Sequence, residues 1–170
     1  IAGLIVFTNT ISRAANYAYI MASVLMGFML YLLLSVNLID LIHLFVDAKT
    51  HYFGFAAIIL ASFISVYGIL NSFNTKLIKL EIPIKKLKKE VKIMHLTDIH
   101  IGHFRGKKFL NKIVNKTISA NVDVVFITGD LFDGKFRLSN EHLEPLKRLK
   151  VPIYFVEGNH DKYTGVKTIK

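Results

Sequence analysis

The stretch HLTDIH, residues 95–100, decides the fold of the second part of this sequence. It closes the mainly apolar run VKIMHLT (91–97) and then turns polar at Asp98 and His100. Short runs with β-branched or aromatic residues on both faces are typical of strands that are buried from both sides. Because side chains two residues apart in an extended chain project to the same side, we expect Asp98 and His100 to face one ligand together.

Two further runs repeat the pattern, VDVVFIT (122–128) and PIYFV (152–156). Between the first two runs, residues 106–120 carry apolar side chains at helical spacing with lysines opposite, and Asn121 is a suitable left-handed stop. The stretch EHLEPLKRLK (141–150) predicts a second, short helix. The resulting order β-α-β-α-β indicates a layered α/β domain with a largely parallel sheet.

Polar residues of one chemical kind follow each predicted strand. Asp98 and His100 follow the first, Gly129-Asp130 the second, and the GNHD stretch (158–161) the third. The carboxyl ends of parallel strands meet at one edge of a sheet, where ligands gather. Carboxylate, imidazole and amide donors suit Mn²⁺, Fe²⁺ or Zn²⁺, and the sequence has no cysteine to offer a thiolate.

Each of these residues also has a plainer interpretation. Asp98 could cap a turn, Asp130 and Asp133 could be ordinary turn acids, and Gly158-Asn159 could form a simple turn. The plainer interpretations would have to place metal-type donors at three strand ends of one edge by coincidence. We therefore favour a metal centre. Asp133 itself we interpret as a turn or surface residue.

The blocks DIH, GD and GNHD, in this order and each after a strand, resemble the first three motifs of the calcineurin-like metallophosphoesterases. The resemblance covers about residues 80–165 and implies the N-terminal part of that family's catalytic domain. It implies two divalent metal ions, with Mn, Fe or Zn as the candidates. Asp98 and His100 would bind the first metal, Asp130 would bridge both, and Asn159 would bind the second.

The resemblance also assigns the chemistry. His160 would face the substrate and help to protonate the leaving group, with Asp161 orienting it. Two cations about 3.5–4 Å apart clamp the attacking and leaving oxygens and lower the pKa of a bound water. A metal-bridged hydroxide would then attack phosphorus. The family adds a lone His and a GHxH block further along, and the sequence ends at Lys170 before either. We therefore expect a fragment of a longer enzyme that is inactive alone.

The first part of the sequence has a different composition. Residues 1–75 contain only four charged side chains, so the whole net charge of +10 lies in residues 76–170. Residues 14–38 and 53–73 are long and apolar enough to cross a bilayer, and residues 1–7 could end an earlier span. A buried core helix is the alternative, but two such runs in succession favour a transmembrane hairpin. We therefore expect a membrane domain (1–75), a basic juxtamembrane linker (76–90) and the catalytic part (91–170).

Lysines mark the expected orientation. The join between the spans holds one lysine, whereas the segment after the second span is rich in lysine, and Arg13 lies on that same side. The positive-inside rule then predicts a multi-pass protein of the inner (plasma) membrane with a cytoplasmic catalytic part. The stretch IKKLKKEVK (84–92) could bind anionic lipid or could be a solvated topology signal, and the sequence leaves both open.

Three functions remain in view. The leading one is a membrane-anchored phosphoesterase acting on a phosphoester or pyrophosphate, with a lipid-linked substrate suggested by the anchor. The second is a nuclease or cyclic-nucleotide phosphodiesterase, which the positive charge would suit, although the lysines cluster beside the membrane part rather than around the motifs. The third is a catalytically inactive membrane protein that binds or assembles with a partner.

Overall fold

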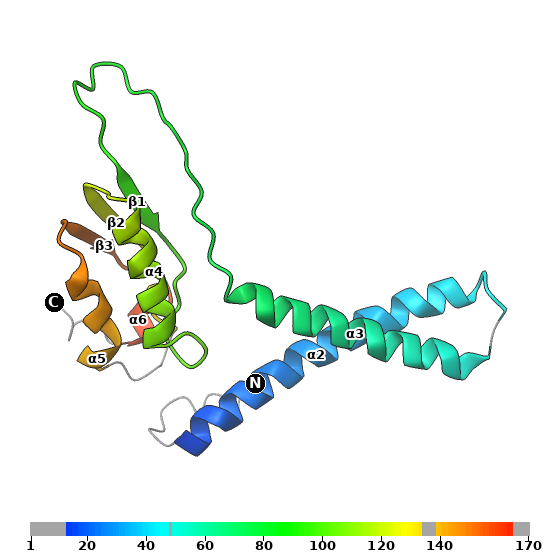
Figure 1. The fold of residues 1–170 in the computed structure, drawn as a ribbon. Helices are drawn as coiled ribbons and strands as arrows, with labels where there is room; N and C mark the ends of the chain where they lie inside the picture. The colour runs from blue at the N-terminus through cyan, green and yellow to red at the C-terminus, as the bar shows by residue number, and fades with distance from the viewer. Residues whose placement is uncertain (1–12, 48, 134–138, 165–170) are drawn as a thin grey trace. The chain divides into compact units, whose positions relative to one another are not determined.

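The computed structural model describes residues 13–47, 49–133 and 139–164, and Figure 1 shows their fold. The chain divides into two compact units. One unit is Tyr17–Thr75, and the other combines Ile1–Asn16 with Lys76–Lys170. Each unit is therefore described by itself.

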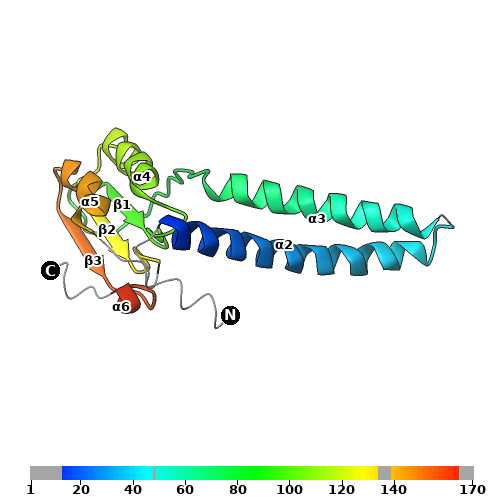
Figure 2. The ribbon, with the colours of Figure 1, turned by 90° about the horizontal axis from the view of Figure 1, so that it is seen from below.

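The first unit is built from two long helices, α2 (Arg13–His43) and α3 (Thr50–Ser72), which run antiparallel (Figure 2). Both are long and apolar enough to cross a membrane. Their large apolar side chains are mostly exposed, as in Leu33 at 61% and Phe63 at 69%. Side chains of this kind are stable on a helix surface when lipid surrounds it.

The buried residues of this helical unit are small. Ser35, Ala57 and Ala61 are at most 2% exposed. Small side chains at such positions let two helix backbones approach each other closely within a membrane. The Ser65 hydroxyl donates a hydrogen bond to the carbonyl oxygen of Ala61 at 2.8 Å, which satisfies its donor inside the helix.

The second unit contains a three-stranded sheet of β1 (Ile93–Leu96), β2 (Val124–Thr128) and β3 (Ile153–Val156). The strands lie in the order β1-β2-β3. Both pairs are parallel, which confirms the predicted parallel sheet. In this register, His95 of β1 lies beside Phe126 of β2, which lies beside Tyr154 of β3. All three strands therefore end at the same edge, and the loops that follow them lie side by side.

Helical segments connect these strands. Helix α4 (Lys107–Ser119) links β1 to β2 and ends before Asn121, whose φ of 48° is the predicted left-handed stop. Helix α5 (Asn140–Leu143) continues into the 3-10 helix η1 (Glu144–Arg148). The short α6 (Asp161–Thr164) follows β3. Lys107 pairs with Glu144 between α4 and η1, and this hydrogen-bonded ion pair lowers the pKa of the Glu144 carboxyl.

Among the described residues, the buried core lies on one face of the sheet. Met94, Val125 and Ile127 pack with the apolar side of α4, where Leu110 and Val114 are buried. The opposite face carries Ile93, His95, Phe126 and Tyr154, among the residues that the alternation of side chains places there.

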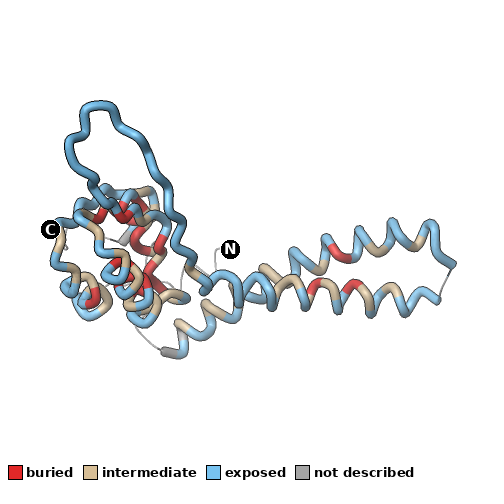
Figure 3. Tube along the Cα trace, turned by 45° about the horizontal axis from the view of Figure 1, so that its top comes forward, coloured by how far each residue is buried: buried red, intermediate tan, exposed pale blue. Residues whose placement is uncertain are grey.

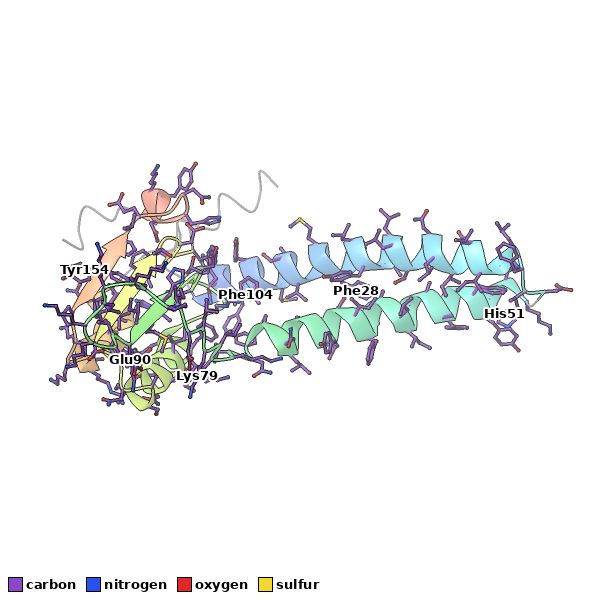
Figure 4. The ribbon with its side chains drawn as sticks, turned by 90° about the horizontal axis from the view of Figure 1, so that it is seen from above. Phe28, His51, Lys79, Glu90, Phe104 and Tyr154 are labelled. Atoms are coloured by element: carbon purple, nitrogen blue, oxygen red, sulfur yellow. The ribbon has the colours of Figure 1, made fainter. Side chains whose placement is uncertain are left out.

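The expectation of strands buried from both sides is therefore wrong for the described residues. β3 is exposed along its length, and Tyr154, labelled in Figure 4, is 58% exposed. The physical reason is that α4 and η1 contribute their apolar side chains to one face. Across residues 13–47, 49–133 and 139–164, no helix or strand contributes a second buried cluster to the other face.

Candidate metal centre

The loops after β1 and β2 run alongside each other at the carboxyl edge of the sheet. The backbone amide of Asp98 donates to the carbonyl oxygen of Gly129 at 3.3 Å, and the amide of His100 donates to that of Asp130 at 3.0 Å. The amide of Ile101 continues the series to Leu131 at 2.8 Å. These hydrogen bonds extend the strand pairing into the loops, so the side chains of both loops have fixed positions.

Left-handed backbone turns the candidate ligands toward one another. Asp98, Gly129, His100 and Asp130 have φ angles of 54°, 90°, 52° and 51°. Glycine adopts such angles freely, but residues with a side chain rarely do, so those at Asp98, His100 and Asp130 each cost on the order of 1 kcal/mol or more. Strain of this kind persists where the surrounding structure imposes it, most often at functional sites.

The structure corrects the reason given for pairing Asp98 with His100. The two residues are not in extended chain, so alternation along a strand does not bring them together. Their side chains nevertheless approach each other, with His100 Nε2 and Asp98 Oδ1 3.8 Å apart. Two left-handed residues, separated by the buried Ile99, produce this approach.

Asp98, His100 and Asp130 form one group that could hold a metal ion. One donor atom from each lies within 4.8 Å of the others. The side chain of Asp98 is 64% exposed and that of His100 is 28% exposed, so an ion can reach them from solvent. Two carboxylates and an imidazole fit a divalent transition metal by their donor chemistry.

A second group adds a residue that the sequence analysis set aside. His100, Asp133 and His160 also offer donor atoms within 4.8 Å of one another. The rings of His100 and His160 meet edge to face, with 4.8 Å between their centroids. Asp133 was interpreted as a turn or surface residue, yet its side chain belongs to this group. The signal was its position three residues after Asp130 in the loop that follows β2.

The loop after β3 is fixed to Asp130. The backbone amide of His160 donates to Oδ1 of Asp130 at 3.0 Å. A Cβ atom at Gly158 would lie 2.2 Å from the same oxygen and 2.5 Å from the Asp130 nitrogen. Only glycine leaves room for Asp130 here, which explains the GN pair better than a simple turn does.

Asp161 is fully buried, and its carboxylate accepts two backbone hydrogen bonds. Oδ1 accepts from the Phe132 amide at 2.9 Å and Oδ2 from the Gly158 amide at 2.8 Å. The resemblance implied that Asp161 orients His160. Its two hydrogen bonds hold the loop after β2 to the loop after β3, which carries His160. Asn159 is exposed in the same turn.

Two basic side chains flank this region. Arg105 Nη1 donates to the carbonyl oxygens of Asp98 and Ile99 at 3.2 Å each, and its guanidinium lies 5.0 Å from the centre of the Phe109 ring. Arg105 thereby supports the left-handed turn. Burial lowers the pKa of His103, and the nearby Asp133 carboxylate opposes this shift in part.

This fold and this group of donors define a class of protein. Residues 91–169 match the family model described as calcineurin-like phosphoesterase. Together with the parallel α/β topology, this match confirms the resemblance seen in the three motifs. Residues 91–169 therefore form part of a calcineurin-like metallophosphoesterase catalytic domain.

Individual relatives add the membrane context. A zebrafish protein named "Transmembrane protein with metallophosphoesterase domain" is 37% identical over 64% of this chain and 26% of its own length. An uncharacterized metallophosphoesterase of Helicobacter pylori is 42% identical over 49% of this chain and 23% of its own length. A Caenorhabditis elegans protein named as a metallophosphoesterase is 30% identical over 95% of this chain and 36% of its own length.

The chain therefore spans about a quarter to a third of the length of these relatives. Phosphoesterases of this family use divalent metals, and the donor group at the carboxyl edge of the sheet is consistent with that chemistry. The two apolar helices and the transmembrane naming of the zebrafish protein indicate membrane association.

Proposed function

We propose that this protein is a membrane-anchored, metal-dependent phosphoesterase that hydrolyses a phosphoester or pyrophosphate. One observation supports this proposal most strongly. At the carboxyl edge of a parallel sheet, one donor atom from each of Asp98, His100 and Asp130 lies within 4.8 Å of the other two. In this proposal Asp98 and His100 would hold one metal ion, Asp130 would be shared by both ions, and Asn159 would help to hold the second. Mn, Fe and Zn are the candidate metals.

The metals would supply Lewis-acid activation of water and of the phosphoryl oxygens. The protein's own residues supply position and protons. His160, half-buried beside His100, would donate a proton to the leaving oxygen. A carboxylate oxygen of Asp133 lies within 4.8 Å of a ring nitrogen of His160, close enough for Asp133 to help orient the imidazole. Asp161 acts through the backbone, because its buried carboxylate fixes the loop that carries His160.

Membrane attachment points to the class of substrate. An enzyme held at the bilayer by α2 and α3 meets lipid-borne phosphates at high local concentration, so we propose a lipid-linked phosphoester or pyrophosphate. The positive-inside rule supports an inner-membrane, multi-pass arrangement with the catalytic part in the cytoplasm.

The test is hydrolysis of bis-p-nitrophenyl phosphate by the full-length protein with Mn²⁺. We expect activity that Asp130→Asn and His160→Ala each reduce by at least a hundredfold. Asp123→Asn is the matched control, because Asp123 is an exposed acid whose Oδ2 accepts a hydrogen bond from the Lys92 amide, away from the site. Activity that survives both site changes would remove this mechanism.

A second comparison separates the candidate substrates. Hydrolysis of a phosphorylated lipid in mixed micelles, with little action on single-stranded DNA or a cyclic nucleotide, supports the lipid-linked substrate. The reverse preference would make the protein a nuclease or cyclic-nucleotide phosphodiesterase. Bound Mn²⁺ without hydrolysis of any of these would favour a binding or assembly role.

A further inference from the structure

The basic linker, residues 76–90, differs from an ordinary loop. It joins α3 to β1 without a helix or strand, and every one of its residues is exposed. Figure 3 draws it in pale blue along its whole length. Its Lys79 and Glu90 are labelled in Figure 4.

Large aliphatic side chains are exposed to solvent along this linker. Ile78 is 85% exposed, Leu80 79% and Ile82 68%. Flexible linkers in water have few such residues, because a low apolar content keeps them soluble and unattached. A contiguous set of exposed apolar side chains marks an interaction surface instead.

The linker also carries a strong positive charge. It holds six lysines and two glutamates, a net charge of +4 from the sequence. Its first half alternates, with Leu80, Ile82 and Ile84 at every second position and polar residues or proline between them. In the extended chain that Figure 1 shows, side chains at every second position project to one side. One side of the linker is therefore apolar.

We propose that the basic linker binds an anionic lipid surface, with its aliphatic side chains in the headgroup layer and its lysines on the lipid phosphates. Charge complementarity and continuity support this partner, because the linker follows directly on the apolar helix α3. Each lysine near an anionic leaflet favours the bound state by about fivefold. Apolar side chains add to lipid binding at an interface.

Nucleic acid is a weaker match for the same lysines. A phosphate backbone attracts lysines but offers no apolar layer to Leu80, Ile82 and Ile84. The proposal concerns attachment and does not depend on catalysis. Should the proposed function hold, a linker bound to lipid would keep the catalytic part close to a lipid-borne phosphate.

These 170 residues contain no cysteine, so one introduced here is a specific labelling position once any cysteine elsewhere in the full-length protein has been replaced. Ile82→Cys is labelled with an environment-sensitive fluorophore in the full-length protein, which is reconstituted in nanodiscs of neutral lipid or of neutral lipid with phosphatidylglycerol. We expect a blue-shifted emission and quenching by spin-labelled lipid only in the anionic nanodiscs. Raising the salt concentration to about 1 M should reverse most of the shift, because it screens the lysines.

Two controls test whether the lysines of the basic linker cause the fluorescence shift. Changing Lys85, Lys86, Lys88 and Lys89 to Gln should abolish the shift, whereas changing Lys108, Lys112, Lys147 and Lys150, exposed lysines of the catalytic part, should leave it in place. A label at the exposed Ser119 of α4 reports any general approach of that part to lipid.

Four results would overturn the proposal. They are an equal signal in neutral and anionic nanodiscs, a shift that survives loss of the four linker lysines, an equal shift at Ser119, and protection of the label by single-stranded DNA rather than by lipid. Reconstitution yield and circular dichroism of each variant confirm that it is folded.

Discussion

The backbone amide of His160 donates a hydrogen bond to Oδ1 of Asp130 across 3.0 Å. This bond joins the loop after β3 to the loop after β2, so the proposed proton donor and the proposed bridging ligand have a fixed relative position. The neighbouring Gly158 passes so close to Asp130 that no side chain fits between them.

Gly158→Ala should displace Asp130. The added Cβ would lie 2.2 Å from Asp130 Oδ1, so the carboxylate or the loop must move. We expect Mn²⁺ affinity to fall at least tenfold and the free energy of unfolding to fall by about 1–3 kcal/mol. Isothermal titration and thermal unfolding of the full-length protein measure both. Gly106→Ala, where a Cβ meets nothing within 4 Å, is the matched control. Equal effects at the two glycines would show that the contact with Asp130 is unimportant.

Asp161→Asn should loosen the two loops. An amide group cannot accept hydrogen bonds at both of its ends, so either the Phe132 or the Gly158 amide loses its buried acceptor. Such an unsatisfied group costs about 1–3 kcal/mol. We expect a lower thermal midpoint and a kcat reduced more than KM. Asp123→Asn, at an exposed acid with one backbone hydrogen bond, should change stability little. Unchanged kcat in Asp161→Asn would mean that the loop does not position His160.

Arg105→Gln should weaken the turn that carries Asp98. The guanidinium donates to two carbonyl oxygens of that turn, at Asp98 and Ile99. Losing these two hydrogen bonds should lower the free energy of unfolding by about 1–2 kcal/mol. We expect a three- to tenfold loss of Mn²⁺ affinity, measured by equilibrium dialysis. Arg148→Gln, which removes a single exposed hydrogen bond to Asn111, is the control. A loss of substrate affinity with intact metal binding would indicate that Arg105 contacts substrate instead.

The proposed orientation is tested with reporter fusions. A reporter enzyme that works only in the cytoplasm should be active when it is fused after Lys92, because the lysines of the basic linker favour the cytoplasmic side. A reporter placed in the join after His43 should be active only on the opposite side. Activity of the Lys92 fusion on the external side would reverse the topology.

The sequence predicted the parallel sheet because apolar strand patterns alternate with helical patterns along the chain. It could not predict the geometry that pairs Asp98 with His100, because left-handed backbone at residues with side chains is imposed by neighbouring loops. Asp133 was interpreted as a turn or surface residue for a related reason: its place near His160 depends on two loops that are distant in sequence. Burial of the strands was overestimated because an apolar pattern records which faces can be covered, and in the described residues only one is.

The central claim is that Asp98, His100 and Asp130 bind a common metal ion. The most direct measurement is Mn²⁺ binding by equilibrium dialysis with elemental analysis, for the full-length protein and for Asp98→Asn, Asp130→Asn and the double variant. We predict that each single change weakens binding at least tenfold and that the double variant loses less than the product of the two, because both carboxylates serve one ion. Binding that is unchanged in both single variants, or weakened equally by Asp123→Asn, would contradict the account.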